Sequence, residues 1–207
     1  MTYLKLTERI PKNICLALSG GVDSMVGLDF CIKMKRNVTA LHFNHGTKDS
    51  KKYEDFLLRE CARLDIKLIV GRITSPIPKG RSKEDFWREE RYNFFKRCRS
   101  DLPVITCHHL GDAVETWVFS SMKGNPKIIP YKRDYILRPF LLNNKERILE
   151  WAEASSINFI SDKTNLDLSF DRNFIRHEMM PYVKRINPGI EKTIKKKILS
   201  SIKENNS

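Results

Sequence analysis

The sequence lacks several features that would place it in a familiar class. No run of about 18 apolar residues occurs among its 207 residues, so the sequence predicts no membrane span. The N-terminal stretch Met1 to Lys12 lacks the apolar core of a secretory signal peptide. The five cysteines are scattered and form no Cys-x-x-Cys pair, which argues against a zinc or iron–sulfur site. These absences favour a cytoplasmic globular protein of one domain, with or without a small appendage.

Acidic residues are few relative to basic ones. The chain has 38 lysines and arginines against 25 acidic residues, which gives a formal net charge of +13. Such an excess indicates partners rather than fold. Nucleic acid is the first candidate and an acidic membrane surface the second, while a lysine-rich surface that only aids solubility stays an alternative.

The first two thirds of the chain alternate between strand-like and helix-like segments. Buried strands are expected at 14–18, 38–44, 67–73 and 103–107, and helices at 23–34, 51–64, 82–99 and 112–122. This alternation predicts an α/β fold with a doubly wound parallel sheet that is covered on both faces. In such sheets ligands bind beyond the carboxyl ends of the strands, where three polar segments fall: 19–24, 42–46 and 108–115.

The pattern changes from about residue 138. An edge strand is expected at 138–142, a helix at 145–154, a polar loop at 162–172, and a helix that Asn173 caps and Pro181 interrupts. A last helix over 190–203 carries an apolar face and a largely separate set of lysines. We therefore expect a sheet domain at 1–140 and a small helical extension at 141–207 that completes the active site and contacts RNA.

The stretch Ser-Gly-Gly-Val-Asp-Ser at 19–24 stands where the first strand gives way to the first helix. Glycines let the backbone approach a ligand, and N–H groups at a helix start bind phosphate. The lysine of a Walker loop is absent, which excludes that class of nucleotide site. Asp23 would repel a polyphosphate unless a cation such as Mg²⁺ lay between them, although it could instead only cap the helix.

This stretch resembles the pyrophosphate loop of the PP-loop ATPases, enzymes that split ATP between its α and β phosphates. Five further segments resemble motifs of one branch, the tRNA(Ile)-lysidine synthetases. These segments are His42–Gly46, Glu84–Tyr92, Thr106–Thr116, Arg138–Leu141 and the pair Asp162–Asn165 with Asp171–Glu178. Two departures stand out, because Gly111 replaces an aspartate and Trp87 replaces a small residue. Family members typically carry further C-terminal domains, so minimal forms are the expected comparison.

The resemblance implies an adenine nucleotide alpha-hydrolase-like fold and a two-step reaction. The 2-keto oxygen of the wobble cytidine attacks the α phosphate of ATP, and pyrophosphate leaves. The ε-amine of free lysine then attacks the activated carbon and expels AMP. ATP and Mg²⁺ are the implied cofactors, and the anticodon loop of a tRNA is the implied partner.

The same resemblance assigns roles to individual residues. Nucleotide binding falls to Ser19, Gly20, Gly21, Val22, Asp23, Ser24 and His45. Catalytic roles fall to Asp23, which is also the metal ligand, and to Asp112, Glu115 and Arg172. Contacts with substrate or RNA fall to Arg88, Arg91, His109 and Arg176. The net charge of +13, rather than the resemblance, predicts RNA contacts for Lys195, Lys196 and Lys197 on the last helix.

Ordinary structural roles compete with each assignment. Asp112 and Glu115 are spaced i, i+3 and could hold an ammonium group, or they could simply favour a helix start. Arg88 and Arg91 could pair with Glu84 or Glu90, and His109 could be structural. Arg172 and Arg176 could pair with Asp162, Asp167 or Asp171. At the level of the protein, the alternatives are a PP-loop enzyme with another nucleophile and a degenerate basic RNA-binding module.

Overall fold

The computed structural model describes residues 3–161 and 167–205, and its centre is a six-stranded sheet with the order β3-β2-β1-β4-β6-β5. All neighbouring strands are parallel except β5, which runs antiparallel to β6 at the edge. The strands are β1 (Asn13–Ala17), β2 (Asn37–Asn44), β3 (Lys67–Arg72), β4 (Val104–Ile105), β5 (Lys132–Arg133) and β6 (Ile136–Leu137). The predicted doubly wound sheet is confirmed.

Helices cover both faces of this sheet because the buried strand β1 is apolar on both sides. Ile14 and Leu16 pack with the helices of one face, whereas Cys15 packs with the aromatic residues of the other. The first face carries α1 (Val22–Lys33), α2 (Ser50–Arg63) and α5 (Lys145–Ala154), and the second carries α3 (Lys83–Cys98). Ser82 caps α3 as expected, accepting a hydrogen bond from the Asp85 N–H.

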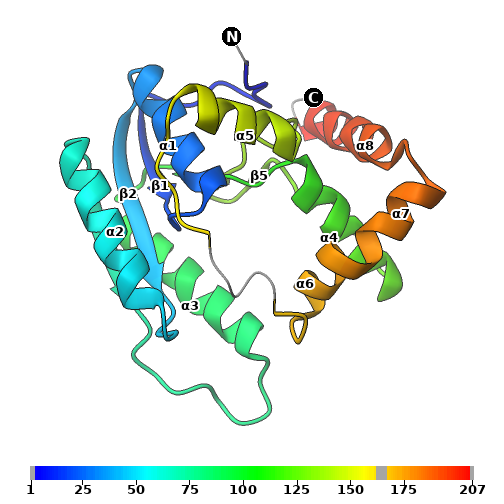
Figure 1. Ribbon diagram of the computed structural model, residues 1–207, viewed down its shortest axis with the longest axis horizontal. Coiled ribbons are helices and arrows are strands. Elements are labelled where there is room, and N and C mark those ends of the chain that lie inside the picture. The colour runs from blue at the N-terminus through cyan, green and yellow to red at the C-terminus, as the bar shows by residue number, and fades with distance from the viewer. Residues whose placement is uncertain (1–2, 162–166, 206–207) are drawn as a thin grey trace.

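A second core lies to one side of the sheet, where α4 (Leu110–Met122) packs against α8 (Ile190–Asn205) (Figure 1). The predicted apolar face of α8 is confirmed, because Ile194 and Ile198 are fully buried in this core. The segment before α8 consists of α6 (Asp171–Phe174), the π-helix η2 (Ile175–Met179) and α7 (Met180–Ile186). Contacts from η2 to α4 bring this late segment back to the sheet domain.

The strand expected at 138–142 is wrong, since the chain forms β6 just before it and then turns. The buried guanidinium of Arg138 donates to the Pro130 carbonyl at 2.9 Å, and the Arg138 N–H donates to the Tyr131 carbonyl at 2.7 Å. Pro139 follows and has no N–H to offer a neighbouring strand. The local apolar run was therefore a poor guide to strand pairing here.

The predicted cap at Asn173 is also wrong. The helix begins two residues earlier, at Asp171, and the Asn173 amide instead donates to the Asp167 carbonyl at 2.9 Å. Pro181 does not break the helix, because it sits in the first turn of α7, where a missing N–H costs little. The irregularity is the wide turn of η2 that precedes it.

Part of the expected polar loop, including the motif Asp162–Asn165, lies outside the described residues. Across the ranges that are described, no helix combines the length and apolar character that a membrane crossing requires.

Candidate active site

The turn between β1 and α1 forms a compact loop at the carboxyl end of the central strand. Gly20 has a φ of 88°, a conformation that residues with a side chain adopt only at a cost. The Ser24 hydroxyl donates to the Gly21 carbonyl at 2.9 Å and accepts the Ser19 N–H at 3.2 Å. Within the described chain no side chain caps α1, so the N–H groups of its first turn stay available to an anion.

A cavity of about 360 Å³ opens directly beside this loop. It lies at the carboxyl ends of β1 and β4, two neighbouring strands from which the chain continues toward opposite edges of the sheet. Such a point is the usual ligand position in a doubly wound sheet. Its walls include residues 17–19, 23–24, 41–45 and 106–108, together with Trp87, Arg91, Tyr92 and Phe95 from α3. The prediction that separate polar segments meet at one sheet edge is confirmed.

The end of β2 is held in shape by a buried carboxylate. The Asn44 amide donates to Glu54 on α2 at 2.8 Å, and its oxygen accepts the Gly46 N–H at 2.8 Å. Arg72 on β3 pairs with the same carboxylate. This network fixes the backbone that carries His42 and His45 into the cavity wall.

Two histidine nitrogens at the cavity are buried and lack a hydrogen-bond partner among the described residues: His42 Nε2 and His45 Nδ1. The His45 ring packs against that of Trp87, with 5.1 Å between the ring centroids and 34° between the ring planes. Burial, reinforced by the positive charge of Arg91, lowers the pKa of His45 to about 4, so its ring is neutral at pH 7. Buried polar atoms normally have partners, so these atoms indicate a ligand with a polar edge and a flat face.

Arginines of α3 gather around one tyrosine at the cavity. The guanidinium carbons of Arg88 and Arg91 lie 5.0 and 5.8 Å from the centre of the Tyr92 ring. Burial lowers the pKa of Arg91, and the positive charges of Arg88 and Arg172 add to the effect. Such a concentration of positive charge favours an anionic ligand.

Among the described residues, neither arginine forms an ion pair with Glu84 or Glu90, which was the expected alternative. Glu84 lies 3.1 Å from Arg172, and that ion pair links α3 to α6. Arg91 lines the cavity directly, whereas Arg88 lines a neighbouring surface hollow. The charge of Arg91 is therefore placed for a ligand in the cavity.

Asp23, in the first turn of α1, forms an ion pair that the sequence did not suggest. Its Oδ1 lies 2.6 Å from Nζ of Lys145, in the first turn of α5, 122 residues further along the chain. The His109 Nε2 lies 3.9 Å from the same oxygen. No cluster of three potential metal ligands occurs in the described ranges, so a metal here would need oxygens from a ligand as well as from Asp23.

His109 and Asp112 together cap the N-terminus of α4. The Gly111 N–H donates to His109 Nδ1 at 3.0 Å, and the His109 N–H donates to Asp112 at 2.8 Å, which makes a reciprocal cap. A Cβ at Gly111 would lie 2.7 Å from the His109 ring. The glycine that departs from the family pattern thus makes room for a histidine cap, while the neighbouring His108 lines the cavity.

Arg176, on η2, closes over the two carboxylates of α4. Its guanidinium donates to both oxygens of Glu115, at 2.8 and 2.7 Å, and to Asp112 at 3.2 Å. Those hydrogen bonds with Glu115 raise the pKa of Arg176. The expected alternative of pairing with Asp167 or Asp171 does not describe Arg176, whose partners are the carboxylates predicted to be catalytic. Asp162, the third expected partner, lies outside the described residues.

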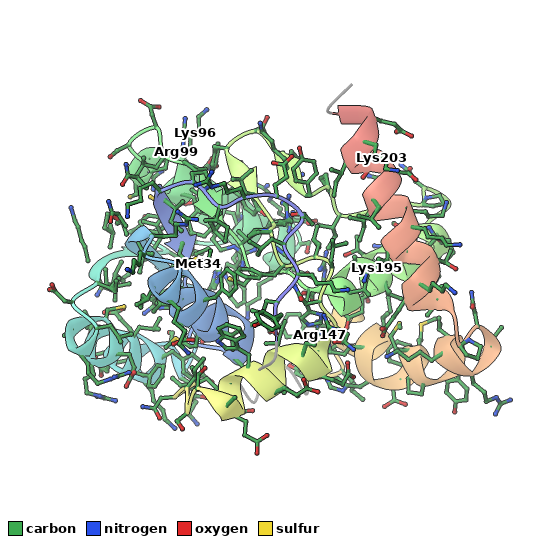
Figure 2. The ribbon with its side chains drawn as sticks, turned by 90° about the horizontal axis from the view of Figure 1, so that it is seen from above. Met34, Lys96, Arg99, Arg147, Lys195 and Lys203 are labelled. Carbon is green, nitrogen blue, oxygen red and sulfur yellow. The ribbon has the colours of Figure 1, made fainter. Side chains whose placement is uncertain are left out.

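The lysines predicted to contact RNA lie elsewhere in the molecule. Lys195 is half-buried, and Lys196 and Lys197 are exposed on α8. Figure 2 shows α8, with Lys195 and Lys203 labelled, at the end of the molecule opposite α2. Their role in binding RNA stays a prediction.

Sequence reasoning missed one polar residue of the site entirely and undervalued others. Lys145 stood in no polar motif, and nothing nearby in the sequence linked it to Asp23. His42, His108 and Trp87 lay within segments already singled out, but their part in the cavity wall depends on how the strands end.

Comparisons with known proteins agree with this geometry. The family model of the PP-loop domain matches residues 2–183. Proteins named tRNA(Ile)-lysidine synthase are similar in sequence. The one from Thermotoga sp. (strain RQ2) is 31% identical over 88% of this chain and 48% of its own length. The one from Persephonella marina is 35% identical over 86% of this chain and 43% of its own length.

The protein of that name from Nitrosomonas europaea is 31% identical over 92% of this chain and 45% of its own length. The chain therefore spans about half the length of the curated relatives it matches. Among solved structures, an NH3-dependent NAD synthetase from Campylobacter jejuni superposes with a TM-score of 0.50 at 16% identity. That match covers 94% of this chain and 87% of the synthetase, and it supports the fold alone.

Proposed function

The chain belongs to the PP-loop domain family, and from this premise we propose that it ligates lysine to the wobble cytidine of an isoleucine tRNA. ATP is cleaved to AMP and pyrophosphate, and the AMP group activates the base. One observation carries the proposal: the Ser19–Ser24 loop, the cavity with its orphaned polar atoms, and the carboxylates of α4 meet at one sheet edge. The names of the relatives support lysine and tRNA as the substrates.

The nucleotide would occupy the cavity and the adjoining loop. A purine suits the wall of His45 and Trp87, whose rings offer a flat face, and the free nitrogens of His42 and His45 offer hydrogen bonds. The phosphates suit the N–H groups of the first turn of α1 and the guanidinium of Arg91. These groups stabilise charge that builds up on phosphate during attack by the base oxygen.

The proposal includes a Mg²⁺ ion bound at Asp23, because the chemistry of a carboxylate suits this metal. A single carboxylate beside a phosphate site is a typical protein contribution to magnesium binding, with phosphate and water oxygens completing the set. When bound, the ion neutralises phosphate charge. Lys145, which pairs with Asp23 in the structure, supplies a positive charge at the same place.

In the second step the ε-amine of lysine must be neutral, because only the deprotonated nitrogen can attack the activated base. Asp112 and Glu115 present carboxylate oxygens from the first turns of α4. His109 lies between this pair and Asp23, because its Nε2 is close to the carboxylates of both Asp112 and Asp23. A carboxylate pair can hold the ammonium of lysine and accept its proton as the nitrogen attacks. AMP then leaves with the former 2-keto oxygen of the cytidine.

RNA binding draws on the net charge of +13 and on the arginines of α3. The target base must leave a single-stranded loop to reach the cavity edge, as an anticodon loop permits. Since the reaction uses ATP and tRNA, we expect it to take place in the cytoplasm.

The proposal is tested by incubating the protein with radiolabelled lysine, ATP, Mg²⁺ and a tRNA that carries a cytidine at the wobble position. Label should enter the tRNA only when ATP is present, and AMP and pyrophosphate should appear in step with it. Release of ADP and orthophosphate would contradict the PP-loop chemistry. If the tRNA is adenylated but lysine is not transferred, and another amine or a thiol donor completes the reaction, the alternative of a different nucleophile is favoured. Binding of tRNA without any ATP cleavage would favour a degenerate RNA-binding module.

A further inference from the structure

The two carboxylates proposed to hold the amine are already occupied by a cation of the chain itself. Arg176 makes two parallel hydrogen bonds to Glu115 and a third to Asp112. Asp112 spends one carboxylate oxygen on the cap of α4, because its Oδ2 accepts the His109 N–H at 2.8 Å. Little acceptor capacity is left for a second cation while Arg176 is in place.

A guanidinium and an ammonium are alternative ligands of the same pair of carboxylates. Both are positive, both donate several hydrogen bonds, and both have long flexible stems. The side chain of Arg176 is 39% exposed, whereas those of Asp112 and Glu115 are 20% and 15% exposed. Because Arg176 is the most exposed of the three, its side chain can move into solvent while the two carboxylates stay in the site.

We propose, building on the proposed function, that Arg176 is an internal substitute for the substrate ammonium: it fills the amine subsite until lysine displaces it. The subsite is then never left as a bare pair of half-buried carboxylates, which would be costly. Lysine binds with an affinity reduced by the need to displace this competitor. Arg176 is accordingly a residue that sets amine specificity and affinity, rather than one that contacts RNA.

Displacement would also reach beyond the subsite, because Arg176 belongs to η2. The same continuous segment carries Arg172, whose ion pair with Glu84 joins it to α3 at the nucleotide cavity. Arrival of the amine therefore loosens the ion pairs that Arg176 forms with α4 and leaves the ion pair of Arg172 with α3 in place. Arg63 on α2 provides a matched control, because it pairs with a carboxylate of similar burial, Glu60, outside the candidate site.

The experiment measures cation binding to the full chain by calorimetry, without ATP or tRNA. Lysine and ethylguanidinium are titrated into the wild type, Arg176→Ala and Arg63→Ala, with norleucine as the analogue that lacks the side-chain charge. We expect Arg176→Ala to bind lysine and ethylguanidinium about tenfold more tightly than the wild type does. Arg63→Ala should match the wild type, and norleucine should not bind to any of the three proteins.

Thermal unfolding supplies the second readout. Arg176→Ala should melt below the wild type, and ethylguanidinium should restore its midpoint while leaving that of the wild type unchanged. Adding Glu115→Gln to Arg176→Ala should remove both the binding and the rescue. If Arg176→Ala folds poorly, Arg176→Met keeps the length of the stem and takes its place.

Lysine binding to either Arg176 variant that is no tighter than binding to the wild type would overturn the inference. The outcome is separate from that of the proposed function, because it requires no turnover. A protein that gains cation binding in Arg176→Ala but never labels tRNA would keep the substitute-cation inference for its amine site and lose the assignment of the reaction.

Discussion

The two sides of the candidate site differ in how their polar groups are satisfied. On the nucleotide side, His42 and His45 keep buried nitrogens without partners, and the start of α1 has no side-chain cap in the described chain. On the amine side, Asp112 and Glu115 are paired with Arg176. Asp23 lies between the two sides and is paired with Lys145.

This difference follows from the cost of burying each kind of group. Burying a neutral imidazole or an amide N–H without its ligand costs little free energy, because only a hydrogen bond is missing. A half-buried carboxylate without a counter-charge is more costly, so the fold supplies a cation. Under the proposed function, the nucleotide side binds its ligand directly, whereas Asp112 and Glu115 exchange Arg176 for the substrate amine.

The largest effect should come from the residue that joins the two sides. Asp23→Ala is expected to reduce release of pyrophosphate by about a thousandfold, since it removes a carboxylate in the first turn of α1, beside the phosphate loop. The rate is measured by coupled detection of pyrophosphate with saturating tRNA. Asp29→Ala is the control, because Asp29 lies on the same helix but binds Trp151 and Lys33 away from the loop. Equal losses in both variants would show that Asp23 serves only the stability of α1.

A change on the amine side alone should separate the two half-reactions. Glu115→Gln keeps the shape of the side chain but removes the charge that holds Arg176 and that would accept the amine proton. We expect transfer of lysine to slow by about a hundredfold and release of pyrophosphate by much less. Single-turnover experiments that follow labelled lysine and labelled phosphate together test this. Equal slowing of both steps would erase the distinction between the two sides.

The neutral histidines of the nucleotide side should make the fold sensitive to acid. The pKa of His45 and that of His108 are both lowered to about 4, chiefly by burial, from an ordinary value of 6.5. The unfolded chain therefore takes up protons below pH 6.5 that the folded chain refuses until about pH 4, so stability falls across that interval. Each ring should contribute about 1–2 kcal/mol of loss between pH 7 and pH 5. Urea unfolding of the wild type, His45→Phe and His108→Phe measures it, and an identical loss in all three would contradict the burial of neutral rings.

The smallest effect concerns the lysines of α8, which do not line the cavity. Replacing Lys195, Lys196 and Lys197 with Gln should weaken tRNA binding about tenfold and flatten its dependence on salt, because fewer counterions are released. Ile194 and Ile198 stay buried, so the fold should survive. Affinity is measured against salt concentration for several tRNAs, and the loss should be similar for all of them. An unchanged affinity and salt slope would make these lysines solvated surface only.

Sequence reasoning predicted the sheet domain well because its signals are local. The apolar runs of β1 and β2, the cap at Ser82 and the apolar face of α8 all depend on residues close together in the chain. The strand expected at 138–142 failed because Arg138 turns inward to bond the backbone of its neighbours, which no periodicity reveals.

The site itself was predictable only in part. The Ser19–Ser24 loop and the strand-end segments have recognisable patterns, and they do meet at the cavity. The ion pairs of the candidate site do not follow from spacing, because Lys145 reaches Asp23 across 122 residues and Arg176 reaches Glu115 across 61. Such partners are set by how α5 and η2 pack against the sheet domain, and only a three-dimensional structure reveals them.

The most direct test of the account is mass spectrometry of nucleosides from tRNA that has been incubated with the protein, ATP and Mg²⁺, with and without lysine. With lysine, we predict a modified cytidine whose mass has increased by that of lysine less one water. Without lysine, pyrophosphate should still be released and AMP should remain attached to the tRNA, because the nucleotide side acts before the amine arrives. An unmodified cytidine in both samples, with AMP never linked to the tRNA, would contradict the account.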